Sequence, residues 1–161
     1  MSLRAFLAVR MRLKRAGKRL VMTNGCFDVL HPGHIYYLER ARGLGDALLV
    51  ALNSDNSVRA LKGTGRPVRQ QSERAAMLAA LAVVDYVVIF GGTTAQRVLK
   101  AAAPDIYVKG GDYTPGTLNR GEVSAVRDKG GRVRILPMLA GHSTTNFLRK
   151  LSAQGRGRLI L

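Results

Sequence analysis

The chain has 161 residues, an ordinary apolar content of 47% and a net charge of +16. This length suits one domain with a real core, and no apolar run reaches the roughly 18 to 20 residues that a membrane helix needs. The single cysteine, Cys26, excludes an internal disulfide and indicates a reducing compartment, so we expect a cytoplasmic protein. The charge indicates anionic partners such as phosphorylated metabolites, lipid headgroups or nucleic acid, unless the basic flanks are only solvated faces.

Residues 1–17 are basic and amphipathic, and they predict a first helix that ends near Gly17. This segment lacks the compact apolar block of a signal peptide, so we do not interpret it as one. We place the folded core at residues 18–151 and a loose C-terminal tail at residues 152–161. The whole of residues 1–161 is expected to form a single domain.

Strands and helices alternate through the core. Residues 53–71 are polar and predict a loop, after which Ser72 is the expected N-cap of a helix. The alternation predicts a Rossmann-like α/β fold, a doubly wound parallel five-stranded sheet with helices on both faces, whose ligand lies beyond the carboxyl ends of the strands. Strands are predicted at residues 20–22, 47–52, 86–90, 106–108 and 133–136, and helices at residues 34–44, 72–81, 94–103, 122–129 and 144–151.

The string TNGCFDVLHPGH, residues 23–34, follows the first predicted strand. Its glycines let backbone approach a ligand closely, and a helix start offers unpaired N–H groups to a phosphate. His31 and His34 can donate hydrogen bonds to phosphate oxygens at that point. A metal pair is the alternative, but it needs a third ligand that only His142 could supply; a helix-capping histidine is another. The whole string favours phosphate binding.

This string resembles the signature of the nucleotidyltransferase superfamily that includes the cytidylyltransferases and pantetheine-phosphate adenylyltransferase. The resemblance covers residues 17–151 and favours one branch, the stand-alone adenylyltransferases that make ADP-heptose from D-glycero-β-D-manno-heptose 1-phosphate and ATP. Further strings that carry it are Leu52 to Arg59, Leu61 to Gly63, Gly65 to Pro67, Glu73 to Ala75, Val84 to Val88, Pro104 to Ile106, Lys109 to Tyr113 and Gly141 to Thr145.

The resemblance implies an enzyme that transfers AMP from ATP to the sugar phosphate and releases pyrophosphate, for lipopolysaccharide core or related glycan synthesis. It implies Mg²⁺ held mainly by the substrate phosphates rather than by protein side chains. It also implies a homodimer and a separate sugar kinase in the same pathway, with no membrane span. Binding of nucleic acid is not expected.

Roles for individual residues follow from the same resemblance. His31 and His34 would hold the triphosphate and stabilise the transition state, and the charge of Lys62 would meet the phosphates of both substrates. Weaker candidates for substrate binding are Asp28, Asn53, Arg66, Arg74 and Lys109. The nucleotide-binding residues would be Thr23, Asn24, Gly25, Cys26, Phe27, Gly33, Gly110, Asp112, Ser143, Thr144 and Thr145.

Several of these residues have simpler interpretations. Asp28 suits a hydrogen-bond organiser better than a base, because a sugar phosphate is already ionised at neutral pH. Lys62 could be a solvated loop charge, and Lys109 could orient its loop. Arg74 could pair with Glu73 or Asp85. Residues 143–145 could be helix N-caps, and Cys26 could be a small buried apolar residue.

One segment departs from the pattern of the branch. After the strand at residues 86–90, the sequence reads Gly91-Gly92-Thr93-Thr94-Ala95 where acidic residues and a Thr-Pro pair are usual. Rival substrates are therefore kept open, namely glycerol 3-phosphate with CTP and flavin mononucleotide with ATP. A basic nucleic-acid-binding module has too few interleaved aromatic residues to be favoured. A dinucleotide-binding oxidoreductase lacks its G-x-G-x-x-G string after the first strand.

Overall fold

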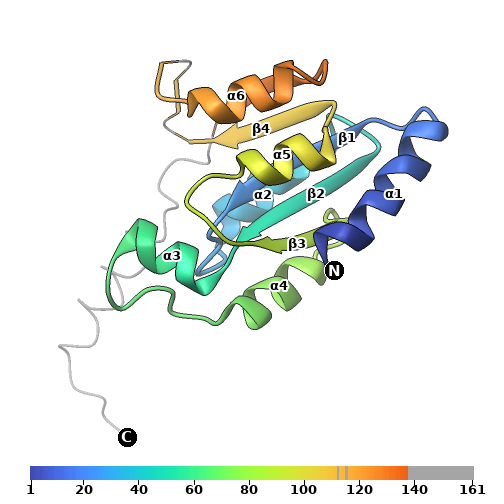
Figure 1. Ribbon diagram of the computed structural model, residues 1–161. Helices are drawn as coiled ribbons and strands as arrows, with labels where there is room; N and C mark the ends of the chain where they lie inside the picture. The colour runs from blue at the N-terminus through green and yellow to red at the C-terminus, as the bar shows by residue number, and fades with distance from the viewer. Residues whose placement is uncertain (112, 115, 138–161) are drawn as a thin grey trace, which may run out of the picture.

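A computed structural model describes residues 1–111, 113, 114 and 116–137 of the chain. In these residues, five parallel strands form one sheet in the order β3-β2-β1-β4-β5 (Figure 1). The predicted Rossmann-like α/β fold is confirmed. The strands are β1 (Leu20–Gly25), β2 (Ala47–Asn53), β3 (Tyr86–Phe90), β4 (Ile106–Gly110) and β5 (Arg132–Leu136). The helices are α1 (Leu3–Arg15), α2 (Pro32–Arg42), α3 (Asp55–Lys62), α4 (Gln71–Ala79), α5 (Gln96–Ala102) and α6 (Arg120–Arg127).

The sheet is covered on both faces, which is why its central strands are continuous apolar runs. All seven residues of β2 are buried. Neighbouring side chains on this strand enter opposite cores, so that Leu49 packs with Phe6 of α1, Leu99 of α5 and Val126 of α6. On the other face Val50 packs in a second core, whose helical members are Tyr37, Leu38 and Ala41 of α2 and Leu78 of α4.

The strand order changes direction between β1 and β4. From β1 the chain moves outward through β2 to β3, and it then crosses back to place β4 on the other side of β1 (Figure 1). The loops that leave the carboxyl ends of β1 and β4 therefore diverge and leave room for a ligand between them. This switch point positions the site described below.

The prediction of a loop over residues 53–71 is wrong for the first half of this segment, where α3 forms. Ser54 is the N-cap, and its side-chain oxygen accepts a hydrogen bond of 3.3 Å from the backbone N–H of Ser57. The helix buries Val58 against the rest of the molecule. Ser, Asp and Asn favour turns as well as helix starts, so a polar opening alone did not distinguish the two.

Ser72 is not the N-cap of α4, because the helix begins at Gln71 with Gln70 as its cap. The Glu73 carboxylate accepts a hydrogen bond of 3.0 Å from the backbone N–H of Gln70 and so fixes this start. Strand β1 continues to Gly25, beyond its predicted end, because residues 23–25 pair with residues 50–52 of β2. The helix predicted over residues 144–151 lies outside the described residues. No described helix is both long enough and apolar enough to cross a membrane.

Candidate active site

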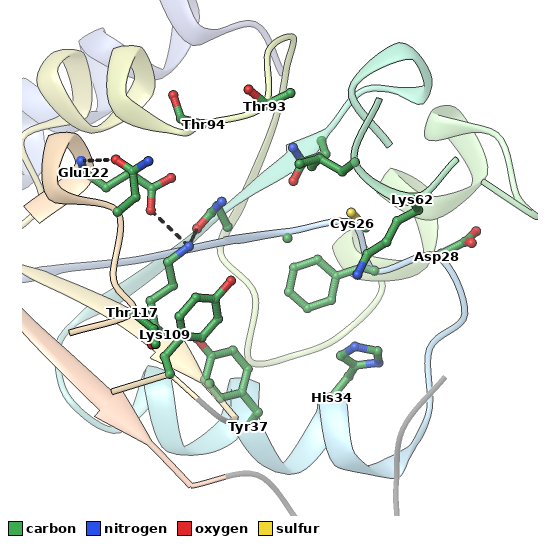
Figure 2. Close-up of a pocket in the computed structure, with 18 of the residues that line it drawn as sticks. Cys26, Asp28, His34, Tyr37, Lys62, Thr93, Thr94, Lys109, Thr117 and Glu122 are labelled. Carbon is green, nitrogen blue, oxygen red and sulfur yellow. Dashed lines mark hydrogen bonds and ion pairs between the residues drawn. The ribbon is translucent and has the colours of Figure 1, made fainter. Parts of the chain in front are cut away.

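A cavity of about 850 Å³ opens at the carboxyl ends of β1 and β4, at the switch point of the sheet (Figure 2). Its residues come from the ends of β1, β2 and β4, the turn after β1, α2, α3 and the loop after it, the loops after β3 and β4, and the start of α6. The described residues that line it are Asn24, Gly25, Cys26, Phe27, Asp28, His34, Tyr37, Asn53, Leu61, Lys62, Arg66, Thr93, Thr94, Lys109, Gly110, Tyr113, Thr117, Asn119 and Glu122.

The turn after β1 is held in an uncommon backbone conformation. Phe27 has a φ of 43°, in the left-handed region that non-glycine residues seldom occupy. Its ring folds back over Gly25, where an added Cβ would come within 2.9 Å of the Phe27 ring. The same ring lies 5.2 Å from the ring of His34. Gly25 is therefore required for the packing that places the aromatic wall beside His34.

The two predicted histidines lie together at the start of α2. His31 is the N-cap and is buried, while His34 stands in the first turn and lines the cavity. Their rings stack with centroids 3.8 Å apart. Burial, and then the neighbouring His31, lower the pKa of His34 to about 4. A neutral His34 at pH 7, next to the positive end of the α2 dipole, can donate a hydrogen bond to a phosphate oxygen.

Lys62 ends α3 and enters the cavity from the side opposite α6. Figure 2 shows its amine reaching toward the middle of the cavity, on the side where His34 lies. Among the described residues its ammonium group has no ion-pair partner. An ammonium group that faces His34 across open space can bind an anion that occupies that space.

Asp28 organises the loop that follows α3. Its carboxylate is 2.7 Å from the guanidinium of Arg66 and accepts hydrogen bonds of 2.7 and 3.2 Å from the backbone N–H groups of Val68 and Arg69. These partners support the interpretation of Asp28 as an organiser rather than a base. Arg66 also lines the cavity, with its charge shared with Asp28.

Arg74 does not reach the cavity lining. Its guanidinium is fully buried and lies 2.8 Å from Asp55, and not beside Glu73 or Asp85 as the sequence suggested. It also donates to the backbone oxygens of Cys26 and Arg69, at 2.5 and 3.0 Å. Arg74 therefore ties α4 to α3 and to the turn after β1. The other expected partner, Asp85, pairs with Arg42 at 2.8 Å.

A buried polar network stands on the α6 side of the cavity. Lys109 Nζ lies 3.1 Å from Glu122 Oε2 and donates a 2.9 Å hydrogen bond to Asn24 Oδ1. The Tyr107 hydroxyl lies 2.6 Å from Asn24 Oδ1 and 2.8 Å from Glu122 Oε2. Burial, together with the Glu122 charge, raises the pKa of Tyr107, so this hydroxyl keeps its proton. Glu122 Oε1 accepts from the backbone N–H of Ala95 at 2.8 Å.

The remaining candidates are divided between the cavity and the core. Asn53 lines the cavity and donates to the Ser57 hydroxyl at 2.7 Å. Cys26 also lines it, but burial raises the pKa of its thiol, which disfavours a nucleophile. Thr23 is buried outside the lining, and its hydroxyl contacts the Tyr37 hydroxyl at 2.7 Å. Gly33 is buried within α2, and Gly110 lines the cavity. Asp112, Ser143, Thr144 and Thr145 lie outside the described residues.

Sequence reasoning missed the buried acidic residue of the site, Glu122. An acidic residue in the first turn of a helix indicates a dipole partner, and its cavity contacts depend on how α6 packs beside β4. Tyr107 was predicted only as part of a strand. The other lining residues not predicted are Tyr37, Leu61, Thr93, Thr94, Tyr113, Thr117 and Asn119. In the described residues, no three His, Cys, Asp or Glu side chains are close enough to hold a metal ion.

The fold and the site define a class, an α/β protein with a cavity large enough for a nucleotide at the switch point of a parallel sheet. Residues 22–148 match the family model described as cytidylyltransferase-like. A bifunctional protein HldE of Methylococcus capsulatus is 53% identical over 147 residues, which are 91% of this chain and 31% of that protein. The chain belongs to the cytidylyltransferase-like family and is a nucleotidyltransferase.

One further relative and two solved structures are also similar to this chain. HldE of Syntrophotalea carbinolica is 49% identical over 150 residues, 93% of this chain and 30% of that protein, so the chain spans less than a third of these relatives. The crystal structure of a lipopolysaccharide core biosynthesis protein from Thermoplasma volcanium is 30% identical with a TM-score of 0.61, and covers 76% of this chain and 98% of its own. Pantoate-beta-alanine ligase from Francisella tularensis shares the fold alone, at 13% identity and a TM-score of 0.58, over 98% of this chain and 78% of its own.

Proposed function

We propose that this chain transfers AMP from ATP to D-glycero-β-D-manno-heptose 1-phosphate and releases pyrophosphate. The observation that carries the proposal is the placement of His34 and Lys62 around one cavity, beside the N-terminus of α2. Motifs similar to the ADP-heptose branch support the choice of sugar, as does the likeness to a lipopolysaccharide core biosynthesis protein.

The chemistry needs positioning and charge stabilisation more than proton transfer. An oxygen of the sugar phosphate attacks the α-phosphorus of ATP in line, the new P–O bond forms, and the bond to the β-phosphate oxygen breaks. The leaving pyrophosphate takes the electron pair, and no covalent enzyme intermediate is required. Asp28 is not needed as a base, which agrees with its full set of partners in the loop.

The position of each residue in the cavity indicates its role in the proposed reaction. His34 and the N-terminus of α2 hold triphosphate oxygens and stabilise the charge that develops on the leaving group. His31 stacks on His34 and keeps its ring in place. Lys62 attracts both phosphorylated substrates. Mg²⁺, held mainly by the substrate phosphates and water, would neutralise part of the triphosphate charge. We expect the enzyme to act in the cytoplasm as a homodimer, with a sugar kinase supplying its acceptor.

A substrate panel tests the proposal. Pyrophosphate release is measured with ATP or CTP against heptose 1-phosphate, glycerol 3-phosphate and flavin mononucleotide. Release with ATP and heptose 1-phosphate alone is the expected result. Release with another pair would keep the reaction class but reject the sugar. If the folded protein released no pyrophosphate with any pair of substrates, the proposal would be rejected and residues 91–95 would be tested next.

A further inference from the structure

The cavity has two chemically different sides. Lys62, Asp28 and His34 lie together on one side in Figure 2, and Lys109, Thr117 and Glu122 lie on the other. The first side includes the start of α2 and the ammonium group of Lys62, for which the described part of the chain supplies no ion pair. The second side, which we call the polar wall, consists of Asn24, Thr94, Lys109, Asn119 and Glu122.

The charge of the polar wall is already neutralised. Lys109 is 7% exposed and Glu122 is 4% exposed, and they form an ion pair of 3.1 Å. A phosphate could form an ion pair with Lys109 only if Lys109 separated from Glu122. This would leave the buried Glu122 carboxylate uncompensated, at a large cost in free energy. The wall therefore presents neutral hydrogen-bonding groups to the cavity, although it contains a lysine.

Lys109 and Tyr107 also orient the amide of Asn24. An ammonium group has donors only, so the Asn24 atom 2.9 Å from Lys109 Nζ is the oxygen. The Tyr107 hydroxyl lies 2.6 Å from the same oxygen. The amide nitrogen of Asn24 must therefore point away from Lys109 and Tyr107. Within the described residues this NH₂ group has no hydrogen-bond partner. Since Asn24 lines the cavity, this is a donor held ready for a ligand oxygen.

Glu122 links the elements that build this wall. One carboxylate oxygen accepts from the backbone of Ala95, directly after Thr93 and Thr94, and the other contacts Tyr107 and Lys109 of β4. Through those two residues it reaches Asn24 at the end of β1. Removing its charge would loosen Lys109, the amide of Asn24 and the loop after β3 together.

We propose that the polar wall is a subsite for a polyhydroxylated ring, with Asn24 as a direct hydrogen-bond donor and Glu122 as its positioning residue. The inference rests on the proposed function for the identity of the ligands, which are the sugar of the acceptor or the ribose of ATP. It assigns Asn24, which the resemblance placed among the nucleotide-binding residues, to a ring hydroxyl rather than to a phosphate.

Binding to Asn24→Ala and Glu122→Gln tests this inference without requiring turnover. Calorimetry measures the Kd of ATP and of heptose 1-phosphate, and of the bare anions tripolyphosphate and inorganic phosphate. We expect the Kd of one hydroxylated ligand to rise about 5- to 10-fold in both variants, the effect of roughly one hydrogen bond. In Asn24→Ala, the Kd values of the bare anions should stay within about twofold of those of the unaltered protein. In Glu122→Gln they should not rise, because the charge of Lys109 then has no ion-pair partner in the wall.

The ligand whose Kd rises identifies the ring, since heptose 1-phosphate indicates the acceptor sugar and ATP indicates the ribose. Asp128→Asn is the matched control, because this carboxylate at the C-cap of the same helix is exposed and bonds only Ser124 among the described residues. If Glu122→Gln does not fold, judged by circular dichroism, Asn24→Ala decides alone.

Three results would overturn the inference. One is an equal weakening of the bare anions, which would make the wall a phosphate site. The second is an unchanged Kd for every ligand. The third is an unaltered protein that binds neither hydroxylated ligand more tightly than its bare anion. An inactive enzyme would reject the proposed function and leave this comparison of binding intact.

Discussion

At the scale of single residues, His34 has the most direct assigned role. His34→Ala removes a donor that the start of α2 and the stacked ring of His31 hold in place. We expect kcat to fall roughly 100-fold or more, with a much smaller change in the KM for ATP. Steady-state kinetics measure both constants. Ile35→Ala, at an exposed site on the same helix, serves as the control, and an unchanged kcat in His34→Ala would reject the role.

The lowered pKa of His34 also predicts how stability depends on pH. Its pKa is about 4 in the folded protein and 6.5 when unperturbed, so between these values the unfolded chain binds a proton that the folded protein excludes. The free energy of unfolding should therefore decrease as pH falls from about 6.5 toward 4, by about 2–3 kcal/mol from this residue.

Urea denaturation at several pH values measures this effect, and His34→Gln is the comparison because glutamine does not titrate. The variant should show a shallower decrease in stability between pH 6.5 and 4. Parallel curves for the two proteins would show that His34 is not buried in its neutral form.

The sequence singled out some of the residues that lie at the cavity and missed others. The histidines, Lys62 and the glycine-rich turn come from a continuous string or from loops with a recognisable pattern, so the order of amino acids was enough to find them. Glu122 and Tyr107 acquire their roles only when α6 packs beside β4. Arg74 was misassigned because its partner, Asp55, lies on a helix that was predicted as a loop.

At the scale of secondary-structure elements, Arg74 holds α4 to its neighbours. Arg74→Ala would remove its ion pair with Asp55 and two hydrogen bonds to backbone oxygens in a fully buried position. We expect a loss of about 2–4 kcal/mol in the free energy of unfolding, because backbone oxygens and a carboxylate would lose their partner.

Arg69→Ala is a suitable control for this substitution. Its pair with Glu73 is 3.7 Å long, and both side chains are about half exposed, so little stability depends on it. Denaturation with urea compares the two variants. A loss for Arg74→Ala no greater than that for Arg69→Ala would contradict the structural role.

The elements themselves were predictable to different degrees. Strands β2 and β3 could be predicted directly, because a strand covered on both faces is a continuous apolar run. The ends of helices were less certain, since capping depends on single hydrogen bonds such as the one from Gln70 to Glu73. Helix α3 has only eight residues and a polar start, so its hydrophobic pattern was too short to recognise.

At the scale of the whole molecule, the charge is largely unneutralised. The chain has 26 Lys and Arg residues against 10 Asp and Glu, and seven of those acids form ion pairs in the described residues. The surplus of positive charge favours weak attraction of polyanions in general. The cavity, in contrast, suits a small phosphorylated ligand.

We therefore expect any binding of nucleic acid to be non-specific. Fluorescence anisotropy with a labelled duplex should show a Kd no tighter than about 10⁻⁶ M at physiological salt, and the affinity should fall steeply as salt is added. Binding in the nanomolar range that resists salt and depends on sequence would instead favour a nucleic-acid-binding protein.

The most direct test of the central claim follows the label of ATP through the reaction with heptose 1-phosphate. With ATP labelled at the α-phosphate, the account predicts that the label appears in the nucleotide sugar. With ATP labelled at the γ-phosphate, the label should appear in pyrophosphate. Release of γ-label as inorganic phosphate, or its transfer to the sugar, would contradict attack at the α-phosphorus and with it the assignment of the cavity.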